Sequence, residues 1–543
     1  MALTEYLWIA VLGGIVGFAY GFLIGANDVA NAFASSVSAK SVTLRQAVLI
    51  ASVCEFCGAF FLGAAVTNTV RSKIFDVDLY ESEPEVLMFG MFTSLFSANI
   101  WLFIATYFGM PVSTTHDVVG CIMGFSIAAK GFSSINWNVA VKIFISWFAS
   151  PLVAGTVAGI FFWLVKRFVM KAEDPFQRAY YTFPIVLTIG IGVDLFYVLY
   201  KGVAKVKMEE KMNPAWGVPM CFAIGAFFGL LWVFIFGPCA KSRIEANKAK
   251  KEADAAEKKA DVESAPEPKA DHVDEDHEFN SFQQFLGGEP LAGVGKPTHK
   301  EVVTAQAVAK PVEPAATEVN ASLFQKFKSN TIDQDLHAQS MHESARAQEI
   351  WDKEEQFDED AEYLFNYIQV FTASLNSFAH GANDVANTIA PMSAVIGIYQ
   401  SGEVGSKTSV PPWMLAYGGL AIVMGLLLYG YKVMKSLGYK LTMLSPSRGA
   451  SAELGASLTV VTASFLGIPV SSTQCIVGAV TAVGLVGGRQ AVDWIFLLKI
   501  CCSWAALFFV AVIWSAGFFS FCYYSPGAFY PDYLVNPVLE EEE

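Results

Sequence analysis

Long runs of hydrophobic residues alternate with short polar stretches over most of the 543-residue chain. Most of these runs approach or exceed the roughly 18 residues that a helix needs to cross a bilayer. The pattern predicts an all-α polytopic membrane protein with about 12 membrane segments. The predicted segments are 6–33, 46–68, 87–108, 112–130, 139–166, 181–200, 216–238, 364–397, 412–434, 450–466, 468–486 and 492–523. The two short segments that begin near Pro111 and Pro469 can be re-entrant instead of spanning.

One polar stretch interrupts this pattern. Residues 241–360 hold about half of the 50 Asp and Glu residues of the chain but fewer than half of its 36 Lys and Arg residues. Much of the stretch has too few apolar residues to order itself by burial. We therefore predict four parts: an N-terminal membrane repeat (1–240), a mostly disordered acidic insert (241–360), a C-terminal membrane repeat (361–525) and a tail (526–543).

Composition narrows the class of protein further. Hydrophobic residues make up 54% of the chain and charged residues only 16%, whereas soluble domains carry about a quarter charged residues. The formal net charge of −14 argues against a nucleic-acid partner, which requires a basic face. The chain also contains no P-loop, HExxH or GxSxG motif. We expect a protein embedded in the lipid bilayer, without enzymatic activity and without an enzyme cofactor.

Basic residues in the connections predict an orientation in the membrane. With the N-terminus outside, most Lys and Arg residues beside the segments lie on the cytoplasmic side, as the positive-inside rule requires. Lys166, Arg167 and Lys241 are examples. The acidic insert is then cytoplasmic, and the C-terminal tail, which ends in three glutamates, is extracellular. The plasma membrane is the expected location.

Two motifs occur twice. GANDVAN stands at residues 25–31 and again at 381–387, while GMPVSTT at 109–115 is matched by GIPVSST at 467–473. The two pairs are separated by nearly the same number of residues, so one duplication explains both. In the predicted orientation the first copy starts outside and the second inside. The halves are therefore predicted to be inverted-topology repeats, an architecture of secondary transporters whose site lies at the repeat interface.

The doubled motifs resemble those of the inorganic phosphate transporter (PiT) family, which contains sodium–phosphate symporters and proton-coupled relatives. This resemblance implies inorganic phosphate as substrate, a symport activity and a homodimer. Na⁺ is the favoured coupling ion and H⁺ the alternative, and we expect transport by alternating access. Sulfate permeases are similar to this family. A carrier of sulfate or another tetrahedral oxyanion is therefore the alternative function.

Asp28 and Asp384 lie inside apolar segments, where a carboxylate costs on the order of 2.5–3.5 kcal/mol. The same acid at matched positions of two inverted halves favours a Na⁺ site over a pair of capped helix breaks. Unwinding at Gly25 and Gly381 is expected to free backbone carbonyls as further ligands. Neighbouring side-chain amides are additional candidate cation ligands, namely Asn27, Asn31, Asn383 and Asn387.

The Pro-Val-Ser motifs predict two helix starts, because proline fits the first turn and a serine hydroxyl caps free amides. A helix N-terminus also attracts an oxyanion. Two such half-helices facing the midplane would bind a tetrahedral anion; ordinary capping is the alternative. The candidate phosphate-binding residues are Ser113, Thr114, Thr115, Ser471, Ser472 and Thr473. No arginine lies near either motif, so we expect a cation to bind first and the anion second.

Glu55 and Glu453 are two further acids within apolar segments, and in local context they resemble two glutamates of the same family. The resemblance implies a second cation or proton site, or a role in conformational coupling. A buried, hydrogen-bonded carboxyl is the alternative for each. His116 and His380 flank the motifs without a histidine at the matching repeat position. We expect both to be structural, hydrogen-bonded groups, with pH sensing by His380 as the alternative.

Overall fold

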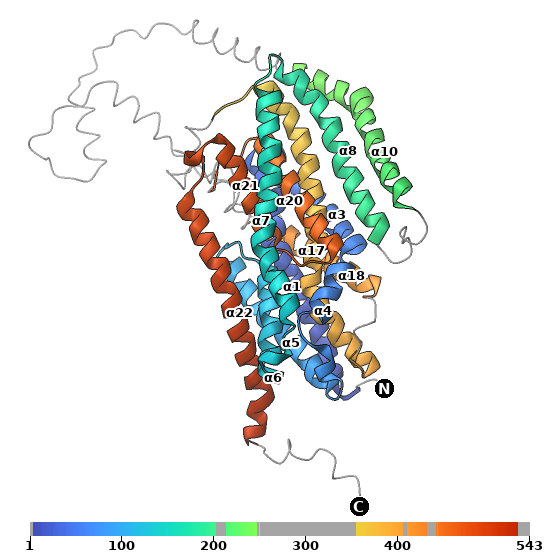
Figure 1. Cartoon of the computed structure of the whole chain (residues 1–543), viewed down its shortest axis with the longest axis vertical. Coiled ribbons are helices and arrows are strands. Elements are labelled where there is room, and N and C mark those ends of the chain that lie inside the picture. Colours follow the sequence, from blue (N-terminus) through green and yellow to red (C-terminus); the bar gives the residue numbers. More distant parts are fainter. Residues whose placement is uncertain are drawn as a thin grey trace, which may run out of the picture. The chain divides into compact units, whose positions relative to one another are not determined.

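Every regular element in the described part of this computed structural model is a helix (Figure 1). The structure describes residues 4–201, 213–246, 249, 355–404, 410–431, 441–442 and 444–529. Within these ranges no β-strand occurs, which confirms the all-helical class there. Most of the acidic insert and most of the C-terminal tail lie outside the described residues, so the predictions made for them remain predictions.

The helices occur in two groups on either side of the insert. The first group contains α1 (Leu7–Asn27), α2 (Val29–Ser38), α3 (Leu44–Leu62), α4 (Ala64–Ser72), α5 (Pro84–Tyr107), α6 (Thr114–Lys130), α7 (Trp137–Val165), α8 (Pro175–Lys201) and α10 (Pro214–Leu231). The second group contains α17 (Glu359–Ser401), α18 (Pro412–Tyr429), α20 (Pro446–Leu466), α21 (Ser472–Gly487) and α22 (Trp494–Phe529). One turn of π-helix continues α7 over Lys166–Met170 and α10 over Trp232–Phe236.

Local sequence explains where many of these helices begin. Thr43 and Gln46 form a reciprocal capping box at the start of α3, which satisfies backbone donors that have no partner inside a helix. The Asp358 carboxylate accepts from the Ala361 N–H at the start of α17. Proline occupies the first turn of α5, α18 and α20, where its missing N–H breaks no intrahelical hydrogen bond.

Nine helices in the described residues are long and apolar enough to cross a membrane. They correspond to nine of the twelve predicted segments. The other three are 112–130, 364–397 and 468–486, which form α6, part of α17 and α21. Helices α6 and α21 have only 17 and 16 residues, and α17 is a 43-residue helix that carries many polar groups. Helices α6 and α21 are thus too short to span, and α17 is long enough but too polar. These three helices carry the second GANDVAN motif and the helix starts of the two Pro-Val-Ser motifs.

The expected unwinding at the two GANDVAN motifs is wrong. Helix α17 runs without a break through residues 381–387. At the first copy only Asp28 separates α1 from α2, its backbone is helical (φ −87°, ψ −39°), and its N–H still donates to the Ile24 carbonyl at 2.8 Å. Neither copy therefore offers the run of freed carbonyls that the sequence interpretation expected.

The glycines of the motif permit close helix packing instead. A Cβ on Gly25 would lie 1.8 Å from the Ile422 carbonyl oxygen of α18, and one on Gly381 would lie 2.2 Å from the Glu55 carbonyl oxygen of α3. Real Cβ atoms do not approach an oxygen so closely, so only glycine fits at these two crossings. The two copies of the motif thus use glycine in the same way, each against a helix from the other half of the chain.

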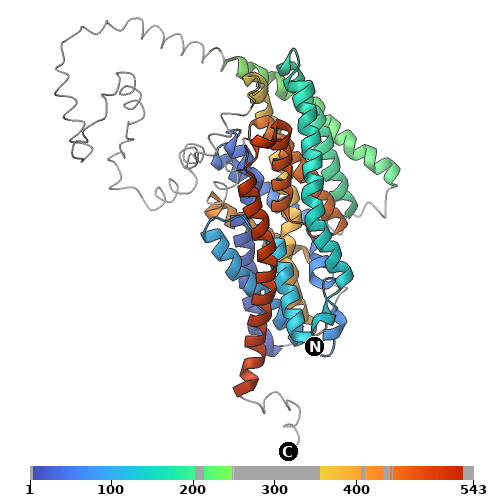
Figure 2. The same cartoon turned by 60° about the vertical axis from the view of Figure 1, so that its left-hand side comes forward.

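Other helices of one half also pack against helices of the other half. Helix α6 packs along α22, and α21 packs along α7, so each half-helix contacts the helix that follows its counterpart (Figure 2). Helices α1 and α17, which carry the repeated motif, contact each other and run antiparallel. Gly17 of α1 faces Met392, while Gly21 lies beside Thr388, which comes earlier in α17. Two antiparallel motif helices are the arrangement that inverted repeats require.

Candidate functional site

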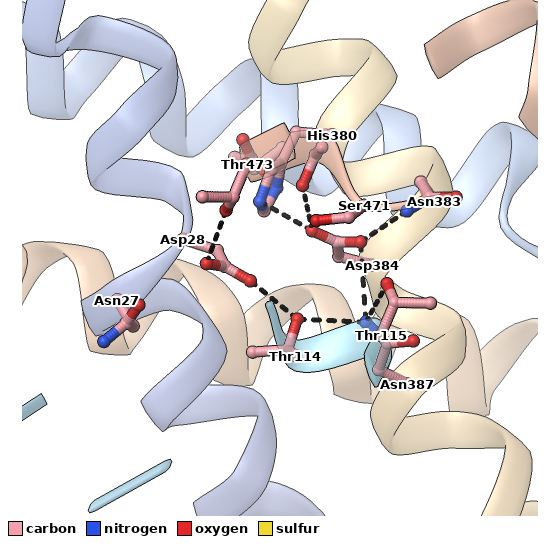
Figure 3. Close-up of polar contacts among 12 residues, drawn as sticks. Asn27, Asp28, Thr114, Thr115, His380, Asn383, Asp384, Asn387, Ser471 and Thr473 are labelled. Atoms are coloured by element: carbon pink, nitrogen blue, oxygen red, sulfur yellow. Dashed lines mark hydrogen bonds and ion pairs between the residues drawn. The ribbon is translucent and has the colours of Figure 1, made fainter. Parts of the chain in front are cut away.

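Asp28 and Asp384 meet in the interior of the helical bundle (Figure 3). Asp28 is 1% exposed and Asp384 is fully buried. Oxygen atoms of both carboxylates and a ring nitrogen of His380 all lie within 4.8 Å of one another. At that separation two negative charges repel by on the order of 3 kcal/mol at an effective dielectric constant of about 20. Neither aspartate forms an ion pair with a Lys or Arg among the described residues, which leaves the repulsion to be offset by other groups.

The N-termini of the two short helices converge on this carboxylate pair. Ser113 caps α6 and accepts from the His116 backbone N–H, while Ser471 caps α21 and accepts from the Gln474 backbone N–H. The predicted helix starts at the Pro-Val-Ser motifs therefore form with serine as the N-cap, but each proline lies two residues before the cap and not in the first turn. Their free amides point a partial positive charge at the region around the two acids.

Hydroxyl groups from both half-helices donate to the carboxylates. Thr114 donates to Asp28 at 2.6 Å and Thr473, from the opposite half, donates to the same carboxylate at 2.9 Å. Ser472 donates to Asp384 at 2.7 Å. The aspartates of the GANDVAN motifs thus accept hydrogen bonds from hydroxyls of the Pro-Val-Ser motifs. Sequence spacing alone could not reveal the contact between Thr473 and Asp28, because these residues are 445 positions apart.

Two asparagines hold the loops that lead into the half-helices. The Asn27 amide donates to the Met110 carbonyl at 3.0 Å and its oxygen accepts from the Val112 N–H at 3.2 Å. Asn383 forms the equivalent pair with Val470, at 2.7 and 3.4 Å. In this structure these side chains clamp the loops that precede α6 and α21, and Asn383 also donates to Asp384.

Asn387 contacts the site more directly. Its amide nitrogen lies 3.1 Å from the Thr114 hydroxyl, 3.3 Å from the Thr115 hydroxyl and 3.5 Å from an Asp384 oxygen. Thr115 in turn donates to the Val470 carbonyl at 3.0 Å, across the two halves. The side-chain oxygen of Asn387 is buried and has no hydrogen-bond partner in the described part of the chain. The side chain of Asn31, the remaining predicted ligand, lies outside the described residues.

His380 connects two acids that lie far apart in the sequence, Glu55 and Asp384. Its Nε2 lies 2.8 Å from Asp384 and its Nδ1 lies 2.9 Å from Glu55. The ring is 4% exposed and the Glu55 carboxylate is fully buried. The spacing of four residues between His380 and Asp384, on one face of a helix, was a signal for the first contact. The second contact joins α3 to α17 and depends on the tertiary fold.

Glu453 belongs to a second, fully buried cluster. Its carboxylate accepts from the hydroxyls of Ser35 at 2.6 Å, Ser36 at 2.7 Å and Thr372 at 2.7 Å, and from the Gln369 amide at 3.4 Å. These partners come from α2 and α17, whereas Glu453 lies on α20. Glu55 and Glu453 are thus both hydrogen-bonded, but they lie in different surroundings and share no hydrogen-bond partner in the described part of the chain.

Known proteins share this chain's sequence and fold. A model of the phosphate transporter family matches residues 24–515. Sodium-dependent phosphate transporter 1 of Rattus norvegicus is 30% identical over 92% of this chain and 93% of its own length. The phosphate-repressible phosphate permease pho-4 of Neurospora crassa is 31% identical over 93% of this chain and 95% of its own. A solved structure described as the sodium-dependent phosphate transporter has a TM-score of 0.66 and 27% identity, covering 94% of this chain and 98% of that one.

The residues that the family model matches include both copies of each motif. These matches confirm the resemblance that the doubled motifs indicated, and with it the prediction of a membrane transporter and not an enzyme. The chain belongs to the phosphate transporter family.

Proposed function

We propose that this chain is a cation-coupled symporter of inorganic phosphate that works by alternating access, with Na⁺ as the coupling ion. The observation that carries the proposal is the meeting of two buried aspartates with two half-helix N-termini. The names of the relatives, which are sodium-dependent phosphate transporters, support the choice of both ions. Proton coupling is the alternative for the cation, and sulfate is the alternative for the anion.

The cation would bind between Asp28 and Asp384. Buried carboxylates that repel each other attract a cation strongly, and a hard cation prefers several oxygen ligands. The unpartnered Asn387 oxygen supplies a further one. Asn27, Asn31 and Asn383 were predicted as ligands too. The loop contacts of Asn27 and Asn383 support an indirect role for these two, in which they hold the anion-binding half-helices beside the cation.

The phosphate would bind at the N-termini of α6 and α21. Helix N-termini offer N–H groups and a partial positive charge to an oxyanion. The hydroxyls of the two motifs would add side-chain donors. The candidate ligands are Ser113, Thr114, Thr115, Ser471, Ser472 and Thr473.

Coupling between the two ions follows from the hydroxyl protons. Thr114, Ser472 and Thr473 now donate these protons to Asp28 and Asp384. A cation that takes the carboxylate oxygens as ligands would release the hydroxyls, which could then rotate and donate to phosphate. Without the cation the same hydroxyls are occupied and the anion would face two unscreened carboxylates. Cation binding first and phosphate binding second is the order that this geometry supports.

Glu453 is the candidate for a second cation site. Four polar side chains surround its carboxylate, and three of them contribute hydroxyl oxygens that could turn toward a cation. Glu55 is the candidate for coupling, because His380 connects it to Asp384. The antiparallel course of α1 and α17 supports two inverted repeats that move relative to each other. A homodimer in the plasma membrane, with outside termini and a cytoplasmic insert, completes the proposal.

Uptake into proteoliposomes tests this function. The purified full chain would be assayed for ³²P-phosphate uptake under a Na⁺ gradient alone, an H⁺ gradient alone, and with excess sulfate. We expect uptake that depends on the Na⁺ gradient and resists sulfate. Uptake that ignores both gradients would refute symport. In a parallel assay with labelled sulfate, uptake of sulfate by a protein that takes up no phosphate would establish the alternative substrate.

A further inference from the structure

His116 joins the two half-helices at a point where the repeats differ. It lies in the first turn of α6, is 4% exposed, and stands at the repeat position that Gln474 occupies in α21. The Nε2 atoms of His116 and Gln474 are 3.3 Å apart, and His116 Nδ1 is hydrogen-bonded to the Ser113 hydroxyl. Trp147 of α7 stacks on the imidazole, with ring centroids 3.7 Å apart. Stacking on Trp147 therefore fixes the orientation of the imidazole plane, and both ring nitrogens have polar partners.

The donor and acceptor roles in this chain of contacts determine one another. The side-chain nitrogen of Gln474 can only donate, so the His116 Nε2 that faces it must be the acceptor. In a neutral imidazole the proton is then on Nδ1, which donates to the Ser113 oxygen. That oxygen also accepts from the His116 backbone N–H at 3.3 Å. Both of its lone pairs are thereby used, and the hydroxyl proton of Ser113 is the part of the group left to donate.

We propose that His116 is a positioning residue for phosphate, since it holds the Ser113 hydroxyl as a donor aimed at the anion between α6 and α21. The inference rests on the proposed function, which places phosphate at these N-termini. An oxyanion accepts hydrogen bonds, so a serine whose hydroxyl proton is donated to another group cannot bind it through that proton. The imidazole itself need not touch the anion.

The second repeat lacks this arrangement. Ser471 caps α21 and accepts from the Gln474 backbone N–H at 3.2 Å, but the Gln474 side chain extends to His116 and not to Ser471. One serine of the pair is thus oriented by a ring and the other is not. The two half-helices therefore contribute unequally to phosphate binding, with Ser113 as the fixed donor.

Rotation of one amide would reverse the chain of contacts. The side-chain oxygen of Gln474 is buried and has no partner in the described residues. If this oxygen faced His116, the imidazole proton would move to Nε2, and Ser113 would donate to Nδ1. Ser113 would then have no proton for the anion. Gln474, on the opposite repeat, therefore determines whether Ser113 can serve as a donor.

Variants of His116 and Ser113 test the inference in proteoliposomes of the full chain. His116→Phe keeps the ring against Trp147 but removes both nitrogens, and Ser113→Ala removes the hydroxyl. We expect each to raise the KM for phosphate about tenfold, as the loss of one hydrogen bond to a charged ligand does. The Na⁺ concentration for half-maximal uptake should be unchanged when phosphate is held at the same multiple of each protein's KM. The double variant should be no worse than either alone, because both remove the same donor.

The outcomes separate this inference from the proposed function. If Ser113→Ala leaves KM unchanged, the proposed anion position is wrong and the inference falls with it. If Ser113→Ala raises KM but His116→Phe does not, or if the two effects multiply, His116 does not act through Ser113 and only the inference is refuted. Thr481→Ala is the matched control, because that α21 hydroxyl bonds its own helix at the Val477 carbonyl.

Discussion

The two GANDVAN segments have identical sequences but different surroundings. In the first, the hydrogen bonds that Asp28 accepts from described side chains come from two hydroxyls, one from each half of the chain. In the second, Asp384 faces the His380 ring, which also contacts Glu55, and it accepts from Ser472 and Asn383 as well. The residue before the repeated glycine is isoleucine in the first copy and histidine in the second. A one-residue difference beside a perfect repeat thus connects Asp384 to a histidine and a glutamate, whereas Asp28 has no such connection within the described residues.

The largest effect is expected from removing either charge. Asp28→Asn and Asp384→Asn preserve side-chain shape but abolish the negative charge that attracts the cation, so phosphate uptake should fall at least about 100-fold, a change of about 2.7 kcal/mol. Uptake into proteoliposomes measures this. Asp493→Asn is the control, because Asp493 caps the start of α22 and asparagine caps a helix as well as aspartate does. Undiminished uptake by Asp28→Asn would exclude Asp28 from the cation site.

The shared use of glycine predicts equal damage in both copies. Gly25→Ala and Gly381→Ala would drive a methyl group into a backbone carbonyl of α18 or α3. Overpacking of this kind costs about 1–3 kcal/mol or more, so both variants should unfold at clearly lower temperature in detergent. Gly14→Ala on α1 has open space around it and should match the unmodified protein. If either motif variant were equally stable, that helix crossing would be looser than the structure shows.

Replacing His380 tests whether the second copy depends on its network. His380→Gln can contact Asp384 or Glu55 but cannot bridge both, so it should lower uptake about tenfold and alter its dependence on Na⁺ concentration. His380→Ile would restore the residue of the first copy. Na⁺ activation curves for the two variants provide the measurement. If both match the unmodified protein, the difference between the copies has no role in coupling.

The smallest effect on uptake is expected from Glu355, a charged residue that precedes α17 and lies outside the candidate site. Glu355 pairs with Lys166 and Lys171 at 2.9 and 2.8 Å, and its side chain is 39% exposed. The hydrogen bonds from Lys171 and Lys166 lower the pKa of Glu355 below its usual 4.5. Its stabilising contribution is therefore complete above pH 4.5 and is lost as the pH falls through the lowered pKa.

Glu355→Gln should therefore cost less than about 1 kcal/mol at pH 7 and nothing in strong acid. Thermal unfolding in detergent at the two pH values checks this, with uptake at pH 7 expected to be nearly unchanged. A large loss of uptake would mean that the end of the insert controls the transport site. Lys166, which also donates to the Val486 carbonyl at the end of α21, offers the route for such an effect.

Much of the helical plan could be predicted from the chain. Nine of the twelve segments correspond to helices long enough to cross a membrane, and the helix starts at Ser113 and Ser471 form as predicted. The error at the GANDVAN motifs has a physical cause. Glycine permits both unwinding and close approach, and only the partner helix decides between the two. The carbonyls of Ile422 and Glu55 stand where a Cβ would be, so the glycines serve packing.

The sequence by itself determined the class of protein, because apolar runs of bilayer length and a perfect repeat of buried acids depend only on local composition and on duplication. It also identified which acids and hydroxyls are candidates for binding. The tertiary structure decided how they are connected: Thr473 with Asp28, Glu55 with His380, and Gln474 with His116. These pairs lie hundreds of residues apart, and short-range hydrogen bonds between them exist only once the two halves have packed together.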